Sequence, residues 1–231
     1  MFYRLIHKIS IHINALLGFN SAWIPKKQIK KILKNKRNPV VVDIGCNVGE
    51  FSELVFDNNS NSVVHAFDLH SSLATILNKK FNRFHFYFSQ TAVSNYVGSG
   101  TFESKNINDR KAFLSRNNNS KSVKINKLDN LLQKFSYSSI TLIKIDTEGN
   151  DYKVLLGAEK ILMITDVVIF EVMYKLICNG NLPQDAINLL RRLNFKYFYR
   201  STKYFGLVAI NEIRPHEIMT QNIVASRINL R

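Results

Sequence analysis

The sequence has only two cysteines and no recognisable secretory signal. Cys46 and Cys178 form none of the paired spacings typical of zinc sites or disulfide frameworks, so neither a structural metal nor a disulfide is expected. The first residues, MFYRLIHKIS, lack the uninterrupted apolar stretch and small-residue cleavage site of an exported protein. We therefore expect a reducing, cytoplasmic setting.

Long hydrophobic runs are also missing, although 45% of the 231 residues are hydrophobic. Polar residues interrupt each apolar segment before it reaches the roughly 18 to 20 residues that a membrane-spanning helix needs. The length suits one substantial core. We predict a single domain at 39–211, preceded by an extension at 1–38 and followed by a tail at 212–231. The sequence does not predict the oligomeric state.

Acidic residues are scarce, with 17 Asp and Glu against 32 Lys and Arg, which gives a net charge of +15. None of them precedes Asp43. A positive field attracts anionic partners. Nucleic acid, an anionic membrane and a phosphate-bearing substrate all qualify, and a generally basic composition with no partner explains the charge equally well.

Two basic helices are predicted in the N-terminal extension. Apolar residues from Phe2 to Leu17 recur at spacings of three and four, which forms one stripe of an amphipathic helix. A second helix begins near Pro25, where Ile29, Ile32 and Leu33 are surrounded by lysines. We favour docking of the first helix on its own domain or on a second subunit, and a solvated helix face for the lysines of the second. Peripheral contact with an anionic inner membrane surface is the alternative.

From Pro39 onward, apolar runs of strand length alternate with helical stretches, as in βαβ units around a parallel sheet. The segments NFKYFYR and YFGLVAI are predicted to form a C-terminal antiparallel hairpin that closes this sheet. The polar segment 104–122 is predicted to be a surface loop, either a lid or an insertion without a role. Strands are expected at 40–44, 62–67, 83–88, 139–145 and 166–172, and helices at 49–57, 71–80, 128–135, 150–162 and 184–193.

A glycine-containing turn follows the first predicted strand, in VVDIGCNVGEF at residues 41–51. Gly45 and Gly49 allow a tight turn and close approach of a ligand to the backbone, and the next helix offers unpaired N–H groups. The spacing is not that of the dinucleotide fingerprint, which disfavours a dehydrogenase. Asp43 at the strand end would repel a pyrophosphate but suits the amino-acid and sulfonium portion of S-adenosylmethionine.

Polar residues at the ends of the next two strands complete a nucleoside site. Asp68, at the end of the second strand, is placed to accept both ribose hydroxyls. Gln90 and Thr91, at the end of the third strand, are candidates for the adenine edge by position alone.

Asp146 and Glu148 follow the fourth strand, at the edge of an open α/β sheet where ligands bind. We expect an extended strand end that points both carboxylates toward cofactor and acceptor. Acidic residues also favour helix N-termini, which gives a purely structural alternative. The same carboxylates suit Mg²⁺, whose involvement the sequence leaves undecided.

The order VVDIGCNVGEF, AFD, QTAVS, TF, KLDNLL, IKIDTEGNDYKVLLGAEKIL and VVIFEV resembles the FkbM family of methyltransferases. The resemblance covers about residues 41–172, and its specific part is the KID-x-EG element followed by L-x-GA. It implies a Rossmann-like class I methyltransferase fold, S-adenosylmethionine as cofactor, and O-methylation of a hydroxyl on a sugar of a glycan or on a polyketide-type product.

The resemblance also implies residue roles. Asp43, Gly45, Asn47 and Gly49 fall on the cofactor loop, and Asp146 and Glu148 on the active-site strand end. AFDLH stands where the family usually has Phe-Glu-Pro, so the shorter Asp68 is expected to share the ribose contact, for instance with the Leu69 backbone.

Methyl transfer to a hydroxyl needs a base within hydrogen-bond reach. We predict Asp146 or Glu148, with Glu171 at the end of the fifth strand as a further candidate and His70 as a less favoured one. The positive charge makes a nucleic-acid methyltransferase the leading rival, but IDTEG replaces the Asn-Pro-Pro-aromatic element that holds a flipped base. A non-catalytic, membrane-associated cofactor-binding protein is the other alternative.

Overall fold

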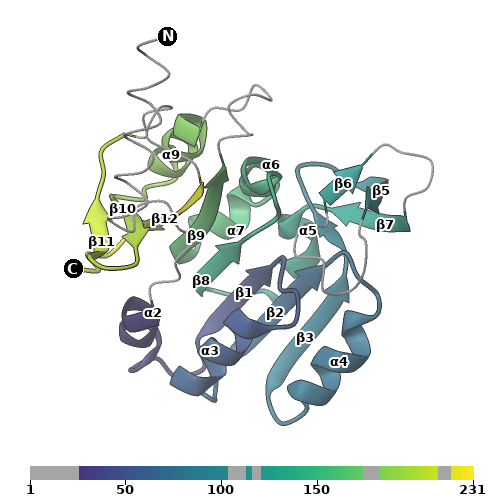
Figure 1. The fold of residues 1–231 in the computed structure, drawn as a ribbon. Coiled ribbons are helices and arrows are strands. Elements are labelled where there is room, and N and C mark those ends of the chain that lie inside the picture. The colour runs from purple at the N-terminus through teal and green to yellow at the C-terminus, as the bar shows by residue number, and fades with distance from the viewer. Residues whose placement is uncertain (1–25, 104–112, 116–120, 174–182, 213–219) are drawn as a thin grey trace.

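The computed structural model describes residues 26–103, 113–115, 121–173, 183–212 and 220–231 (Figure 1). The amphipathic stripe predicted from Phe2 to Leu17 and most of the predicted loop at 104–122 lie outside the described residues. Within them, no helix is long and apolar enough to cross a membrane.

An eight-stranded sheet runs through the molecule in the order β11-β10-β12-β9-β8-β1-β2-β3 (Figure 1). The strands from β3 to β9 in this order pair in parallel, so their carboxyl ends share one edge. The predicted Rossmann-like α/β fold with a mostly parallel sheet is confirmed. The strands are β1 (Val40–Ile44), β2 (Val63–Asp68), β3 (His85–Gln90), β8 (Ile140–Ile145), β9 (Thr165–Met173), β10 (Tyr197–Thr202), β11 (Gly206–Ala209) and β12 (Thr220–Ser226).

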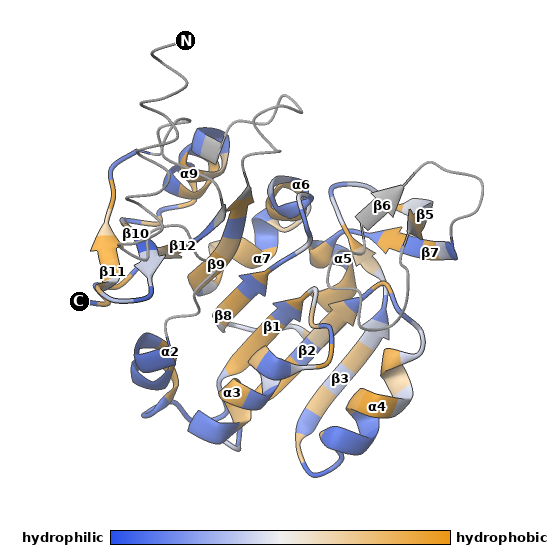
Figure 2. Cartoon of the chain, viewed as in Figure 1, coloured by the Kyte–Doolittle hydropathy of each residue, from blue (hydrophilic) through white to orange (hydrophobic). Residues whose placement is uncertain are grey.

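Helices cover both faces of the sheet and enclose two hydrophobic clusters. Figure 2 shows the apolar strands in orange between helices whose outer sides are blue, while the tips of β8 and β3 turn blue. The polar strand ends therefore mark one edge of the sheet. The helices are α2 (Lys26–Leu33), α3 (Glu50–Asn58), α4 (Leu73–Lys80), α5 (Leu128–Leu132), the 3₁₀ turn η1 (Gln133–Phe135), α6 (Asp151–Leu156), α7 (Glu159–Met163) and α9 (Pro183–Arg192).

The helix predicted over 150–162 is split into α6 and α7 at Gly157. A Cβ atom at Gly157 would lie 2.0 Å from the backbone oxygen of Ser94. The glycine of the L-x-GA element thus allows the chain after β4 to pack directly on this turn.

A second, four-stranded sheet lies between β3 and β8 in the chain, in the order β4-β7-β5-β6. No strand was predicted in this region, and the prediction of a loop was wrong for residues 113–115, 121 and 122. Ala92, Phe102, Val123 and Ile125 form a small core of their own, against which Leu69 packs. The strands are β4 (Ala92–Val93), β5 (Gly98–Glu103), β6 (Phe113–Ser115) and β7 (Lys121–Asn126).

The predicted hairpin exists, since β10 and β11 pair antiparallel. It does not join β9, however. β12, from the segment assigned to the tail, lies between β9 and β10 and pairs antiparallel with both. This strand was not predicted from the sequence.

Candidate functional site

The turn after β1 is held against the ends of β2 and β8. The backbone N–H groups of Gly45 and Cys46 donate to the oxygen of Phe67, at 2.9 and 3.1 Å, and that of Asp146 donates to the oxygen of Ile44 at 3.0 Å. Gly45 has a φ of +75°, and a Cβ there would lie 1.8 Å from the backbone oxygen of Asp146. Only glycine fits this crossing of backbones.

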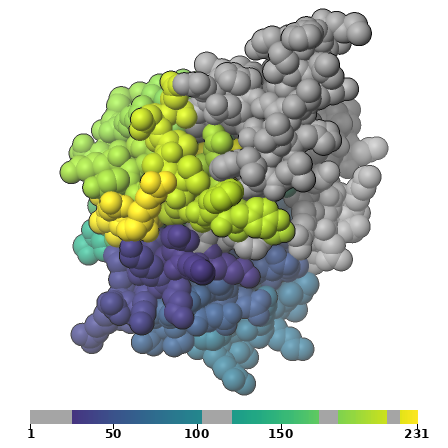
Figure 3. Space-filling model, turned by 60° about the vertical axis from the view of Figure 1, so that its left-hand side comes forward, coloured from purple at the N-terminus to yellow at the C-terminus, as the bar shows by residue number. Residues whose placement is uncertain are grey.

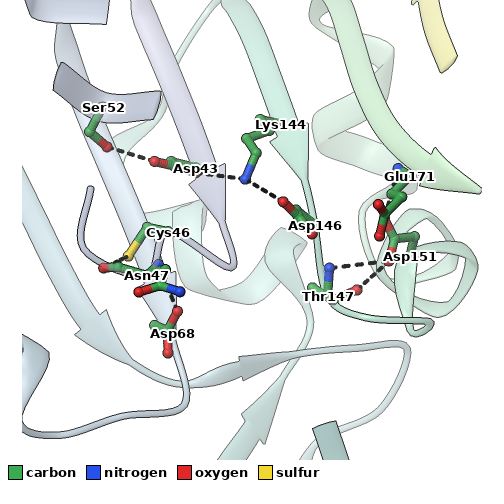
Figure 4. A network of polar contacts seen from close by, with 10 residues as sticks. All are labelled: Asp43, Cys46, Asn47, Ser52, Asp68, Lys144, Asp146, Thr147, Asp151 and Glu171. Carbon is green, nitrogen blue, oxygen red and sulfur yellow. Dashed lines mark hydrogen bonds and ion pairs between the residues drawn. The ribbon is translucent and has the colours of Figure 1, made fainter. Parts of the chain in front are cut away.

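The Asp68 carboxylate at the end of β2 is fixed by two backbone donors, of which Figure 4 shows Asn47. Its Oδ2 accepts from the N–H of Asn47 at 2.9 Å, and its Oδ1 accepts from the N–H of His70 at 3.1 Å. Asn47 adopts a left-handed φ of +46° within the glycine turn. Each Asp68 oxygen keeps lone-pair capacity for a further hydrogen bond, so the half-buried carboxylate is oriented to receive two neighbouring hydroxyls.

Asp43 is completely buried. Its Oδ2 accepts from the hydroxyl of Ser52 at 2.7 Å, and its Oδ1 lies 3.8 Å from the Lys144 Nζ (Figure 4). Burial raises the pKa of Asp43, and the ammonium of Lys144 and the Ser52 hydroxyl oppose this. The carboxylate therefore lies inside the protein, facing Lys144 across the paired strands β1 and β8.

Lys144 connects the interior to the strand edge. Only 8% of its side chain is exposed, and its Nζ lies 3.1 Å from Oδ2 of Asp146, whose side chain is 40% exposed. Burial lowers the pKa of Lys144, but the carboxylates of Asp146 and Asp43 outweigh this and hold the pKa above its usual range. Lys144 is thus a buried cation between two carboxylates.

Asp151, the first residue of α6, ties the loop after β8 to the end of β9. Its Oδ2 accepts from the N–H and the hydroxyl of Thr147, at 3.2 and 2.6 Å, and its Oδ1 accepts from the N–H of Glu171 at 3.0 Å (Figure 4). Burial raises the pKa of Asp151 to about 6, although these hydrogen bonds lower it. The three contacts fix the relative positions of two candidate catalytic segments.

Glu171 is buried, and the pKa of its carboxyl group is strongly raised. Burial, followed by the charges of Asp146, Asp151 and Glu148, raises its pKa to about 8, while Lys144 acts in the opposite direction. All three predicted catalytic carboxylates, Asp146, Glu148 and Glu171, therefore lie within electrostatic reach of one another.

The backbone around Glu148 differs from the prediction. β8 ends at Ile145, and the chain then turns, with positive φ at Glu148 (+51°) and Gly149 (+108°). The expectation that the extended strand continues through Asp146 and Glu148 was wrong, although both carboxylates lie within electrostatic reach of Glu171. The turn is needed because α6 starts only a few residues later.

The residues predicted for the adenine edge lie beside Asp68. Gln90 is exposed, and its Nε2 donates to the backbone oxygen of Leu69 at 3.1 Å. Thr91 is buried, its N–H donates to the oxygen of Asp68 at 3.0 Å, and its hydroxyl lies 2.9 Å from that of Ser89. The structure groups these residues but pairs their polar groups with the protein itself.

His70 is buried, with its ring edge-on to Phe102 of β5 at a centroid distance of 5.2 Å. Within the described part of the chain its Nε2 has no hydrogen-bond partner. No group of three or more His, Cys, Asp or Glu side chains in the same part is arranged to hold a metal ion.

Four residues of this network were not singled out from the sequence: Ser52, Lys144, Thr147 and Asp151. Lys144 did leave a signal, because a lysine between Ile143 and Ile145 interrupts an otherwise buried strand. A buried charge requires a partner, and the aspartate in the equally apolar β1 was the candidate.

The family model described as the methyltransferase FkbM domain matches residues 31–197. No curated protein matches the chain. Similar solved structures include a TehB-like methyltransferase dependent on S-adenosylmethionine from Corynebacterium glutamicum (11% identity, 93% of this chain and 92% of that one, TM-score 0.48). An O-methyltransferase from Bacillus cereus (10%, 95% and 90%, 0.47) and a precorrin-6y C5,15-methyltransferase from Geobacter metallireducens (10%, 88% and 87%, 0.46) are also similar. These similarities are too distant to bear on substrate or mechanism.

Proposed function

Because the chain belongs to the FkbM family of methyltransferases, we propose that it methylates a hydroxyl of a sugar, in a glycan or glycolipid precursor, with S-adenosylmethionine as methyl donor. The observation that carries this proposal is the carboxylate of Asp68, which two backbone N–H groups orient beside the glycine turn. The carboxylates of Asp146 and Glu171 lie at the same edge of the sheet.

The polar groups at this edge of the sheet suit S-adenosylmethionine. Two aligned acceptor oxygens on Asp68 match the two vicinal hydroxyls of a ribose. Gly45 and Gly49, both with positive φ, let the adjacent turn pack closely against its neighbours. Gln90 and Thr91 lie beside Asp68, where the adenine edge is expected. Since Asp43 is completely buried, we assign it an indirect role, which is to hold Lys144.

When bound, the sulfonium supplies the methyl group, whose bond to sulfur breaks as its bond to the acceptor oxygen forms. Glu171 takes the proton of the hydroxyl, for which a pKa near 8 suits it better than that of an ordinary glutamate. Asp146, fixed by Lys144, accepts a hydrogen bond from the acceptor and orients it. Positioning of the oxygen against the methyl carbon provides much of the rate.

The preference for a sugar follows from the charges at the reacting end. Asp146, Glu148 and Glu171 offer several hydrogen-bond acceptors close together, and these suit a compound with many hydroxyls. They would repel a phosphate or carboxylate placed next to the reacting oxygen.

Calorimetric titration with S-adenosylmethionine and S-adenosylhomocysteine tests the cofactor site. We expect Asp68→Asn, which removes one acceptor oxygen and the charge, to weaken binding of both by about tenfold or more. Asp57→Asn, on an exposed aspartate of α3, is the matched control. Equal affinities of the two variants would refute the role of Asp68, and an absence of binding in the unmodified protein would refute the proposed function.

A screen of acceptors with labelled cofactor tests the reaction. Transfer to free or lipid-linked sugars is expected. Transfer only to nucleic acid would replace the proposal with the rival activity, whereas cofactor binding without any turnover would favour a non-catalytic protein.

A further inference from the structure

The turn between β10 and β11 lies beside α2, far from it in the sequence. A Cβ at Gly206 would lie 3.6 Å from Nε2 of Gln28. Arg231 also links the two elements, because its Nε donates to the oxygen of Leu207 at 3.2 Å and its own oxygen accepts from Lys31 Nζ at 3.3 Å. Figure 3 shows the purple α2 directly below the yellow-green strands.

α2 presents a row of lysines to solvent. Its apolar residues Ile29, Ile32 and Leu33 are buried in the domain. No acidic residue occurs before Asp43, so the helix contains no compensating charge of its own. The exposed lysines are Lys26, Lys27, Lys30, Lys31 and Lys34.

The neighbouring turn exposes two consecutive aromatic side chains, Tyr204 at 63% and Phe205 at 58%. Among the phenylalanine side chains that the structure describes, Phe205 alone is exposed. The turn itself is well defined, since the Thr202 hydroxyl accepts from the N–H of Phe205 and donates to the oxygen of Gly206, both at 3.0 Å. Gly206 has a φ of +66°. A defined turn therefore keeps more than half of each aromatic side chain exposed.

We propose that the four lysines of α2, Lys34 directly after it and residues 203–205, together called the basic aromatic surface, bind the surface of an anionic lipid membrane. Lysines near an anionic leaflet gain electrostatic attraction, and aromatic side chains favour the headgroup region. The proposal does not depend on methyl transfer, because none of these residues belongs to the site at the strand ends.

Lys203 favours lipid over nucleic acid as the partner. Its Nζ lies over the Tyr204 ring, 5.3 Å from the centroid. That ammonium obstructs one ring face on which a base would have to stack. At a membrane the same arrangement is favourable, because the ammonium reaches the phosphates while the ring and the lysine stem enter the interface.

Sedimentation of the full chain with vesicles tests the proposal. We compare vesicles of phosphatidylcholine alone with vesicles that contain phosphatidylglycerol at about one third. Binding to the anionic vesicles only is expected, and it should weaken as salt is raised. A lack of binding to anionic vesicles, or equal binding to both kinds, would overturn the proposal.

Two sets of substitutions locate the surface. Tyr204→Ser with Phe205→Ser, and separately Lys27→Gln with Lys30→Gln and Lys34→Gln, should each reduce vesicle affinity by about tenfold or more. Tyr96→Ser with Val97→Ser, an exposed apolar pair elsewhere, is the matched control for the aromatic pair. Lys79→Gln with Lys160→Gln and Lys196→Gln, all at exposed positions, is the matched control for the three lysines. Both controls should bind like the unmodified chain.

Thermal unfolding and cofactor titration of each variant check that the fold is intact. Undiminished vesicle binding by folded variants of the surface would overturn the proposal. A second outcome would also overturn it. If the unmodified chain binds single-stranded RNA but not vesicles, and the substitutions abolish RNA binding, the surface binds nucleic acid.

Discussion

At the scale of single residues, the buried Lys144 of β8 supplies the positive charge between the carboxylates of Asp43 and Asp146. Removing Lys144 leaves Asp43 buried without its counter-charge. We expect Lys144→Met to lower the free energy of unfolding by about 3–5 kcal/mol. Urea unfolding measures this loss, and adding Asp43→Asn to the same chain should restore part of it. A loss below about 1 kcal/mol would show that the pair is not coupled.

The pKa of Glu171, near 8, predicts the pH dependence of catalysis. If Glu171 is the base, kcat/KM rises as the pH passes about 8 and levels off above it, because this ratio reports the free enzyme. Glu171→Gln should reduce the rate by about 10²–10⁴-fold. A profile already level at pH 6 in the unmodified enzyme would contradict Glu171 as the base.

The raised pKa of Glu171 also makes the free energy of unfolding depend on pH. In the folded chain Glu171 keeps its proton up to about pH 8, whereas its ordinary pKa is 4.5. Between these values the unfolded chain has released a proton that the folded chain retains, so the free energy of unfolding falls as pH rises. We expect Glu171→Gln to remove this loss, with a gain of about 2–4 kcal/mol at pH 9 and little gain at pH 4.5. Thermal unfolding at both pH values, with the exposed Glu53→Gln as control, measures the difference.

The functional residues at strand ends could be predicted from the sequence, because polar residues and glycines stand out after apolar runs. The glycine turn, Asp68 and Glu171 all follow apolar runs of strand length. The partners of these residues were not predictable. That Asp151 bonds to Thr147 and Glu171 depends on how α6 meets β9, which local pattern does not encode.

At the scale of elements, the turn between α6 and α7 depends on one missing side chain. Gly157→Ala would place a methyl group 2.0 Å from the Ser94 oxygen and push the chain around β4 away. We expect a loss of about 1–3 kcal/mol in the free energy of unfolding. Gly98→Ala is the control, since its nearest atom would be an ordinary 3.6 Å away. Similar stabilities of the two variants would contradict this close approach.

The strands of the main sheet that alternate with helices were predicted within a few residues, but β12 and the second sheet were not. In TQNIVAS only the last part is apolar, and Gln221 and Asn222 are buried against expectation. β12 is a strand because β9 and β10 each offer it an unpaired edge. Likewise Gly98–Glu103 is rich in glycine and polar residues, and its strand forms through pairing with β7.

At the scale of the whole molecule, Arg227 joins segments that are far apart in the sequence. Its guanidinium donates to the backbone oxygens of Thr165, Leu162 and Leu193, and stacks over Phe195 at 4.7 Å. We expect Arg227→Met to cost about 2–4 kcal/mol in urea unfolding, since buried carbonyls lose a charged donor. Lysine, without the planar fork, should not rescue it. A loss confined to a few tenths of a kcal/mol would show that water replaces the guanidinium.

The antiparallel direction of β12 also decides how the domain would respond to force. β12 ends at Ser226, opposite Val167 at the start of β9, and β1 begins at Val40 on that same side of the sheet. A pull between residues 26 and 231 would therefore act across the strands and open the ladders of β12 one bond at a time. The ladders of β12 can therefore contribute to thermal stability and still open at a low pulling force applied at Arg231.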